Sequence, residues 1–188
     1  MKQSWKPGNL LNPTPVVMVS CAEAGKTPNI ITLAWTGTVC SEPPMLSISV
    51  RKERFSHDII SRSGEFVVNL VPARLAKACD LCGVKSGRDL DKFAAAGLHA
   101  VPVPHLKSAP AIAECPVNLE CAVEKVLELG SHDMFLARIL GVEVDEALLD
   151  EKGRLDLIKA DLIAYSHGAY LRLGNKVGSF GYSVRKNR

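Results

Sequence analysis

The chain lacks any long hydrophobic run. None of its apolar stretches approaches the roughly 20 residues that a helix needs to span a bilayer, and residues 1–7 contain no apolar signal core. Positive charge is not concentrated either, because the net charge is +3 and basic residues alternate with acidic ones except in the tail at 185–188. Nucleic-acid binders usually gather basic residues into a stripe. We therefore expect a cytoplasmic protein with neither a membrane nor a nucleic acid as partner.

Signatures of several enzyme classes are missing as well. There is no GxGxxG or Walker spacing for a dinucleotide or P-loop site, and no GxSxG turn for a serine nucleophile. None of the histidines belongs to an i,i+4 pair or a His-Glu motif, so the sequence predicts no metal site. The five histidines are His57, His99, His105, His132 and His167.

Six cysteines are scattered through the chain, and only Cys79 and Cys82 have CxxC spacing. A second CxxC is missing, and so is the Trp-Cys lead-in of a thioredoxin motif. In a reducing compartment such cysteines are mostly free thiols that pack as small hydrophobic side chains. We favour that interpretation, with a redox role for Cys79 and Cys82 as the alternative.

The pattern of apolar residues predicts a mainly β, α+β fold in one domain covering residues 1–188. Residues 45–51 alternate between apolar and polar with a period of two, which is typical of a strand. Ser56 is a plausible N-cap for a helix that Gly64 ends. Many strands with short connections favour an antiparallel barrel over a doubly wound sheet. Expected strands are 15–21, 28–36, 45–51, 64–70, 115–128 and 133–145, and expected helices are 56–63, 73–82 and 89–96.

Arg51, Arg54 and Ser56 form a candidate phosphate clamp. Arginine offers a fork of donors that matches phosphate oxygens, and a serine at a helix N-terminus lies beside free N–H groups where the helix dipole favours an anion. The alternative is a solvated charged turn. Residues 85–93 are a second polar cluster that could contact an anion, or a solvated loop in which Asp89 caps the next helix.

A flat aromatic ring could lie along the segment that contains Asn29, Thr32, Trp35 and Thr36. On a strand, Thr32 and Thr36 share one face, and Trp35 lies on the other, where its indole could form a flanking wall. The alternative is that Trp35 is a core or interface aromatic. His132 follows a short turn and precedes Asp133, a carboxylate that could orient its ring. The alternative there is a polar residue that caps the turn.

Taken in order, these motifs resemble the flavin reductase-like, FMN-binding split-barrel family, and within it the flavoredoxin-type proteins. The resemblance covers nearly the whole chain. Its motifs are 29–37 (NIITLAWTG), 43–51 (PPMLSISVR), 54–58 (RFSHD), 64–70 (GEFVVNL), 82–89 (CGVKSGRD), 114–121 (ECPVNLEC) and 130–135 (GSHDMF).

The resemblance implies a homodimer of antiparallel split β-barrels with FMN bound non-covalently near the subunit interface. It also implies which residues would contact the flavin. The isoalloxazine would lie by Asn29, Thr32, Trp35 and Thr36, with Cys40 and Ser41 close behind, the phosphate by Arg51, Arg54 and Ser56, and Lys92 near the flavin. His132 looks like the histidine that faces the nicotinamide in the reductase branch, although that branch usually has Gly-Asp-His where this chain has Gly130, Ser131 and His132.

The activity that this resemblance implies is transfer of hydride or electrons from NAD(P)H through FMN to a flavin, a metal complex or a protein acceptor. Such chemistry belongs largely to the cofactor, so the missing catalytic triad is no objection. The first alternative is an FMN electron-transfer protein that reacts poorly with NAD(P)H. The second is a structural relative that binds no flavin.

Overall fold

A seven-stranded antiparallel sheet forms the body of the computed structural model, which describes residues 1–184. The basic tail at 185–188 lies outside the described residues. The strand order is β3-β2-β6-β9-β10-β5-β4. The bounds are β2 (Val17–Cys21), β3 (Asn29–Leu33), β4 (Thr36–Cys40), β5 (Met45–Arg51), β6 (Glu65–Leu70), β9 (Val117–Glu128) and β10 (His132–Val144).

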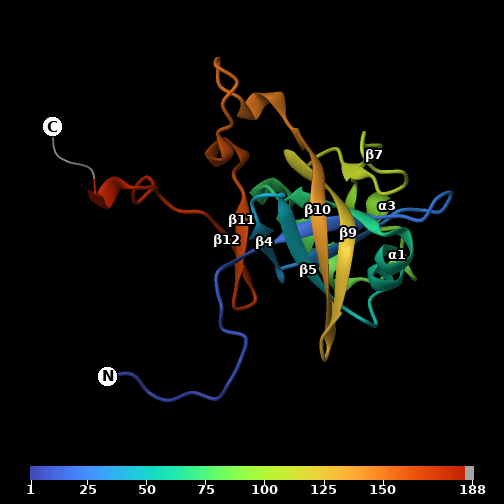
Figure 1. The fold of residues 1–188 in the computed structure, drawn as a ribbon, viewed down its shortest axis with the longest axis horizontal. Helices are drawn as coiled ribbons and strands as arrows, with labels where there is room; N and C mark the ends of the chain where they lie inside the picture. Colours follow the sequence, from blue (N-terminus) through green and yellow to red (C-terminus); the bar gives the residue numbers. More distant parts are fainter. Residues whose placement is uncertain (185–188) are drawn as a thin grey trace.

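The sheet curls into a split barrel because two consecutive strands lie at its opposite edges. Only Ala34 and Trp35 separate β3 from β4, so these two edges must come close together. The N–H of Ser49 on β5 donates to the carbonyl of Trp35 at 2.9 Å, which extends the β4–β5 pairing into this bend. The predicted fold class, mainly β with an antiparallel barrel and a few short helices, is confirmed (Figure 1).

The inside of the barrel holds the larger hydrophobic core. Alternate residues of β5 point into it, with Leu46, Ile48 and Val50 buried as the period of two predicted. Phe66 and Phe135 are fully buried there, and burying such a side chain stabilises a fold by about 1.5–3 kcal/mol. A second core lies on the outer face of β2 and β3, so these strands are covered on both sides.

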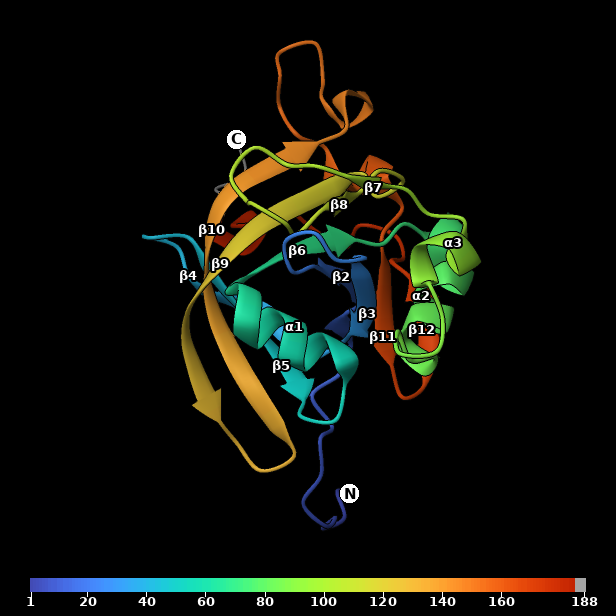
Figure 2. The same cartoon turned by 90° about the vertical axis from the view of Figure 1, so that its right-hand side faces the viewer.

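Three helices pack around β3, which is an edge of the sheet. Helix α1 (Phe55–Ser63) lies against the barrel, with Ile59 and Ile60 in the inner core, whereas α2 (Ala76–Val84) and α3 (Lys92–Ala96) belong to the outer core (Figure 2). A 3-10 turn, η1 (Ala73–Leu75), leads into α2. Within residues 1–184, none of the helices is both long and apolar enough to cross a membrane.

The predicted cap Ser56 and the cap Asp89, which was an alternative interpretation, are both wrong. Ser56 is not the N-cap of α1, because the helix begins at Phe55 after Arg54, and Ser56 is buried inside the first turn with a tertiary partner. Asp89 does not cap α3; the side chain of Asp91 does, accepting from the N–H of Ala94 at 3.2 Å. Gly64 ends α1 as predicted, with a φ of 70° that favours glycine.

Smaller elements complete the chain. The predicted strand at 28–36 is interrupted by the bend at 34–35. The segment around 165–170 forms a hairpin whose first strand also pairs with residues 14–15, which gives a small three-stranded sheet. The extended ends of the chain run away from the barrel (Figure 1). The remaining elements are β1 (Thr14–Pro15), β7 (Ala100–Val101), β8 (Ala111–Ile112), η2 (Glu146–Leu148), η3 (Leu157–Ala160), β11 (Ile163–Ser166), β12 (Ala169–Arg172) and η4 (Tyr182–Val184).

Candidate functional site

An open cleft, which we call the cleft, lies at the split of the barrel. Its volume is about 760 Å³, and its walls come from β3, β5, α2, the tip of the β9–β10 hairpin and the β11–β12 hairpin. The fold therefore gathers residues from distant parts of the sequence. The predicted site residues that line the cleft are Thr32, Trp35, Arg51, Arg54 and His132.

A smaller pocket of about 410 Å³ adjoins the cleft, and we call it the basic pocket. The two hollows share Ile31 and Arg54 in their walls, so they form one continuous concave surface. The second polar cluster of the sequence, at 85–93, contributes to this same pocket rather than to a separate site. Its polar lining includes Asn29, Glu53, Arg54, Ser56, Lys85, Ser86, Arg88 and Lys92.

Three of the predicted residues are not brought to the cleft or the basic pocket within one chain. Thr36 lines a neighbouring hollow of about 320 Å³ that shares Trp35 with the cleft, and its hydroxyl donates to the carbonyl of Ser47 at 2.9 Å. Cys40 and Ser41 follow at the end of β4, where the Cys40 thiol donates to the carbonyl of Glu42 at 3.4 Å. Their contact with a flavin stays a prediction.

Trp35 occupies the bend between β3 and β4 and is 42% exposed, so it is not a core aromatic. Behind it, the hydroxyl of Thr32 donates to the carbonyl of Cys79 on α2. Because its proton is used in this way, the Thr32 oxygen can only accept a hydrogen bond from a ligand. Gly83 allows α2 to approach closely, since an added Cβ would lie 3.2 Å from Cβ of Thr32.

The basic pocket is braced by a buried hydrogen bond between Asn29 and Ser56. The Asn29 amide donates to Oγ of Ser56 at 2.7 Å, and both side chains are buried. The Ser56 hydroxyl therefore keeps its own proton available for an anion. It lies in the first turn of α1, where N–H groups without helical partners and the helix dipole favour negative charge.

Lys92 is 4% exposed and ties β3 to α2. Its ammonium donates to the carbonyl of Ile30 at 2.7 Å and to that of Cys82 at 2.8 Å. An ammonium has three N–H donors, so one is left over after these two bonds. Burial lowers the pKa of Lys92 below its ordinary value. Lys92 is thus both a structural link and a source of positive charge beside the basic pocket.

His132 begins β10, directly opposite Arg51 on β5, and both side chains line the cleft. Partial burial, with the positive charge of Arg51, lowers the pKa of His132 below its ordinary value of 6.5, so its imidazole is neutral at pH 7. The hydroxyl of Ser131 lies 2.8 Å from Nδ1 of His132. The neighbouring polar group is therefore an uncharged hydroxyl.

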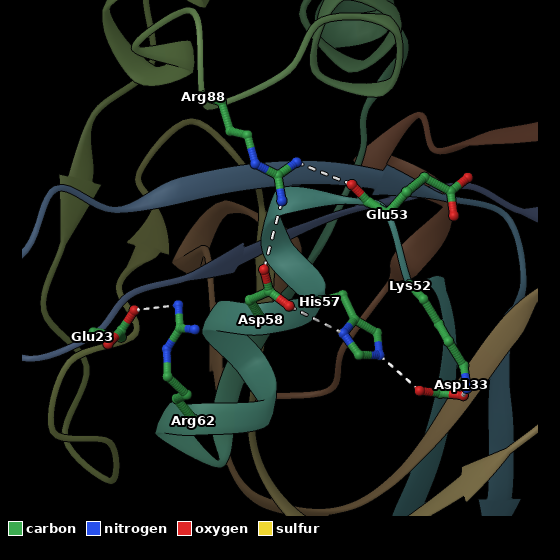
Figure 3. A network of polar contacts seen from close by, with 8 residues as sticks. All are labelled: Glu23, Lys52, Glu53, His57, Asp58, Arg62, Arg88 and Asp133. Carbon is green, nitrogen blue, oxygen red and sulfur yellow. Dashed lines mark hydrogen bonds and ion pairs between the residues drawn. The ribbon is translucent and has the colours of Figure 1, made fainter.

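The prediction that Asp133 orients His132 is wrong. Successive residues of a strand point to opposite faces, and the Asp133 carboxylate meets Nε2 of His57 at 2.8 Å and the ammonium of Lys52 at 3.2 Å (Figure 3). Burial alone would raise the pKa of Asp133, but the His57 hydrogen bond and the Lys52 charge outweigh it and hold the pKa below its ordinary value. The network joins the hairpin tip to the start of α1.

Sequence reasoning missed the wall of the cleft that contains Asp80, Tyr165 and Tyr170. The phenol of Tyr170 donates to Oδ1 of Asp80 at 3.1 Å, and the two tyrosine rings pack edge to face with centroids 5.8 Å apart. Burial raises the pKa of Tyr170. The two tyrosines are paired across a hairpin, which was a possible signal, but Asp80 lies 90 residues from Tyr170 and no local pattern links them.

Cys79 and Cys82 are fully buried in the outer core, together with Cys115. Burial raises the pKa of Cys79 to about 12 and that of Cys82 to about 11. The reactive form of a cysteine is the thiolate, so these thiols are packing groups at neutral pH. In the part of the chain that the structure describes, no group of three His, Cys, Asp or Glu residues is arranged to hold a metal ion.

Comparison with known proteins identifies relatives over nearly the whole chain. A family model described as "Flavin reductase like domain" matches residues 10–174. The flavoredoxin of Desulfovibrio vulgaris (Miyazaki F) is 30% identical with a TM-score of 0.90, covering 98% of this chain and 100% of its own. The flavoredoxin of Methanosarcina acetivorans is 31% identical with a TM-score of 0.88 and the same coverage of both chains.

A Shewanella frigidimarina protein with a split barrel domain shares the fold at a TM-score of 0.80. It is 17% identical, and the match covers 90% of this chain and 86% of that one.

Proposed function

The chain belongs to the flavin reductase-like family, and on this premise we propose that it is an oxidoreductase that binds FMN non-covalently. One observation carries the proposal: an open cleft continues into a pocket lined by basic side chains at the N-terminus of a helix. The cleft volume lies within the range of about 300–1,000 Å³ that small-molecule sites commonly have. A flat ring with a phosphate on a flexible tail fits this combination.

The donors of the basic pocket suit a phosphate. Arg54 offers a planar fork of N–H groups, Ser56 offers a hydroxyl, and Lys85 and Lys92 add positive charge. The Asn29–Ser56 bond and the two carbonyl partners of Lys92 set these groups in place before a ligand arrives. Little ordering is then needed on binding, which favours affinity.

Around the ring, Trp35 would supply a flanking wall and Thr32 an acceptor on the opposite side of its strand. Arg51 and the neutral imidazole of His132 would lie at the open side of the cleft, where the nicotinamide of NAD(P)H could approach. When bound, FMN would accept a hydride from NAD(P)H and pass electrons to a free flavin, a metal complex or a protein. The chain's own residues would bind and orient the flavin and would exclude water from the cleft.

A second candidate is an electron-transfer protein that carries FMN without reacting efficiently with NAD(P)H. It is favoured by the flavoredoxins, which are 30% and 31% identical and match over 98% of this chain. Ser131 also favours the electron-transfer candidate. Its uncharged hydroxyl lies beside His132 at the position where the reductase branch usually has an aspartate carboxylate.

A homodimer would complete the site. The extended ends carry exposed apolar side chains that have little cover within one chain, among them Trp5, Leu11, Val177 and Phe180. Exposed apolar surface of this kind is typical of an interface. A second copy would also explain how Cys40 and Ser41 could approach a flavin. Light scattering on the purified protein would measure the oligomeric state.

The test of function is a visible spectrum followed by rapid mixing. Protein reconstituted with FMN should retain the flavin after desalting, and anaerobic mixing with NADH or NADPH should bleach it within seconds. Retention without bleaching over minutes would favour the electron-transfer candidate. Failure to take up any flavin would contradict both.

A further inference from the structure

Arg88 joins the two sides of the basic pocket. It lies in the loop between α2 and α3, and its guanidinium donates to the carbonyl of Glu53 at 3.0 Å and meets Oδ2 of Asp58 at 3.5 Å (Figure 3). The same guanidinium lies over the ring of Phe55, 5.3 Å from the centroid. One side chain therefore crosses from the loop at 85–88 to the turn before α1 and to α1 itself.

The backbone of this loop also fits closely against the opposite side of the pocket. A Cβ added at Gly87 would lie 2.0 Å from Oδ1 of Asn29 and 3.0 Å from Cδ1 of Phe55. Asn29 in turn is bonded to Ser56. The basic pocket meets the cleft at Ile31 and Arg54, while the loop at 85–88 and the turn at 53–56 are held together by Arg88.

We propose that Arg88 makes the basic pocket selective for a terminal phosphate, so that the chain takes a flavin mononucleotide and rejects a flavin dinucleotide. The inference rests on the proposed function, since it assumes that a flavin phosphate enters this pocket. In FAD the phosphate continues into a second phosphate and an adenosine. We place the path of these groups on the side of the pocket away from the cleft, between the loop at 85–88 and the turn at 53–56, which Arg88 bridges.

Charge acts in the same direction as the bridge. A phosphate monoester carries a charge of about −1.5 to −2 at neutral pH, which matches the cations Arg54, Lys85, Arg88 and Lys92 of the pocket. Glu53 is the one acidic residue of the same lining, with an exposed carboxylate, whereas the half-buried Asp58 carboxylate pairs with the guanidinium from outside that lining. A second phosphate that passed Arg88 would meet the negative charge of Asp58.

The experiment titrates apoprotein with FMN, FAD and riboflavin and follows the quenching of flavin fluorescence. Wild-type protein should bind FMN about a hundredfold or more tightly than FAD, a difference of two powers of ten in Kd. In Arg88→Ala the preference for FMN over FAD should fall about tenfold or more. Asp58→Ala keeps the Arg88 charge but removes one anchor of the bridge, and should reduce the preference in the same direction.

Arg62→Ala is the matched control, because Arg62 also lies on α1 and pairs with a carboxylate, Glu23 at 2.8 Å, outside the pocket. It should leave the FMN-to-FAD preference unchanged. Equal affinity of the wild type for FMN and FAD would overturn the proposal. So would an equal fall in the affinities for FMN and FAD in Arg88→Ala, together with an unchanged FMN-to-FAD preference in Asp58→Ala. If Arg88→Ala does not fold, Asp58→Ala alone decides. Binding of no flavin by the wild type would instead contradict the proposed function.

Discussion

The basic pocket and the cleft adjoin each other but are built in different ways. In the basic pocket, polar side chains are held by short, buried bonds, such as Asn29 to Ser56 at 2.7 Å and Lys92 to two carbonyls. In the cleft, Trp35 is 42% exposed, and Arg51 pairs at the surface with Glu53 at 3.5 Å. Asn29, Ser56 and Lys92 of the first hollow are thus held in place by the fold, whereas Trp35 and Arg51 of the second are exposed.

The difference indicates how the two parts would share binding. A preorganised pocket loses little conformational freedom when it takes up its ligand, so the phosphate end would provide most of the affinity. The cleft would contribute contacts that form only when a ring, or a second copy of the chain, covers Trp35. Substitution of a buried polar side chain in the basic pocket, such as Lys92, should therefore affect both folding and binding. Substitution of Trp35 in the cleft, or of Arg54, which lines both hollows, should affect mainly binding.

The largest effect is expected from Lys92→Met. The substitution leaves the carbonyls of Ile30 and Cys82 without their buried donor, and each unsatisfied buried group costs about 1–3 kcal/mol. The free energy of unfolding should fall by about 2–4 kcal/mol in chemical denaturation, and FMN binding should be lost. Lys77→Met, at an exposed position of α2, is the control. An unfolding midpoint equal to that of the wild type would show that the link is not structural.

Arg54→Ala should produce the next largest effect, on binding rather than folding. Arg54 lines both hollows, and hydrogen bonds from a charged donor contribute about 1.5–3 kcal/mol each. We expect the affinity for FMN, measured by fluorescence titration, to fall about ten- to a hundredfold, with the affinity for riboflavin nearly unchanged. Parallel loss of riboflavin affinity would place the phosphate elsewhere.

Asp133→Asn tests the brace beneath the cleft. The carboxylate is hydrogen-bonded to His57 and forms an ion pair with Lys52, and its pKa is held below the ordinary value of 3.8. A carboxyl with a lowered pKa stabilises the fold above its unfolded-state pKa and loses that contribution as the pH falls through the folded value. The Tm of the wild type should therefore exceed that of the variant by a few degrees at about pH 6.

The same difference should shrink as the pH falls below about 4, first because the carboxyl of the unfolded chain takes up a proton and then because the folded carboxyl does so at a lower pH. A Tm difference that stays constant from pH 6 down to pH 3 would mean that the ionised form of Asp133 is not the source of the stability.

Strand β5 could be predicted because a half-buried strand alternates every two residues. Leu46, Ile48 and Val50 carry that signal in full. By contrast, β2 and β6, buried on both faces, were recognisable only as short apolar, β-branched runs. The break at Ala34 and Trp35 could not be predicted in this way, because the curl of the sheet, and not the local sequence, requires a bend there.

The candidate site was predictable where its residues are close in sequence, as in the turn that contains Arg51 and Arg54. It was not predictable where a contact spans the fold. Ser56 looked like a helix cap, but its partner Asn29 lies 27 residues away. Arg88 reaches the carbonyl of Glu53 across 35 residues. Asp133 was assigned to its neighbour His132, although the alternation of a strand places the two side chains on opposite faces.

Trp35→Ala should have the smallest effect on the isolated fold and so gives the sharpest test of the comparison. The indole is exposed at a bend and lies outside the core clusters, so the free energy of unfolding should change by no more than about 0.5 kcal/mol. FMN affinity should fall several-fold, because stacking and burial of the ring are lost. If a second copy covers this residue, the dimer should also dissociate at a higher protein concentration. A large loss of stability in the monomer would mean that the cleft is braced as firmly as the basic pocket, and the distinction between them would fail.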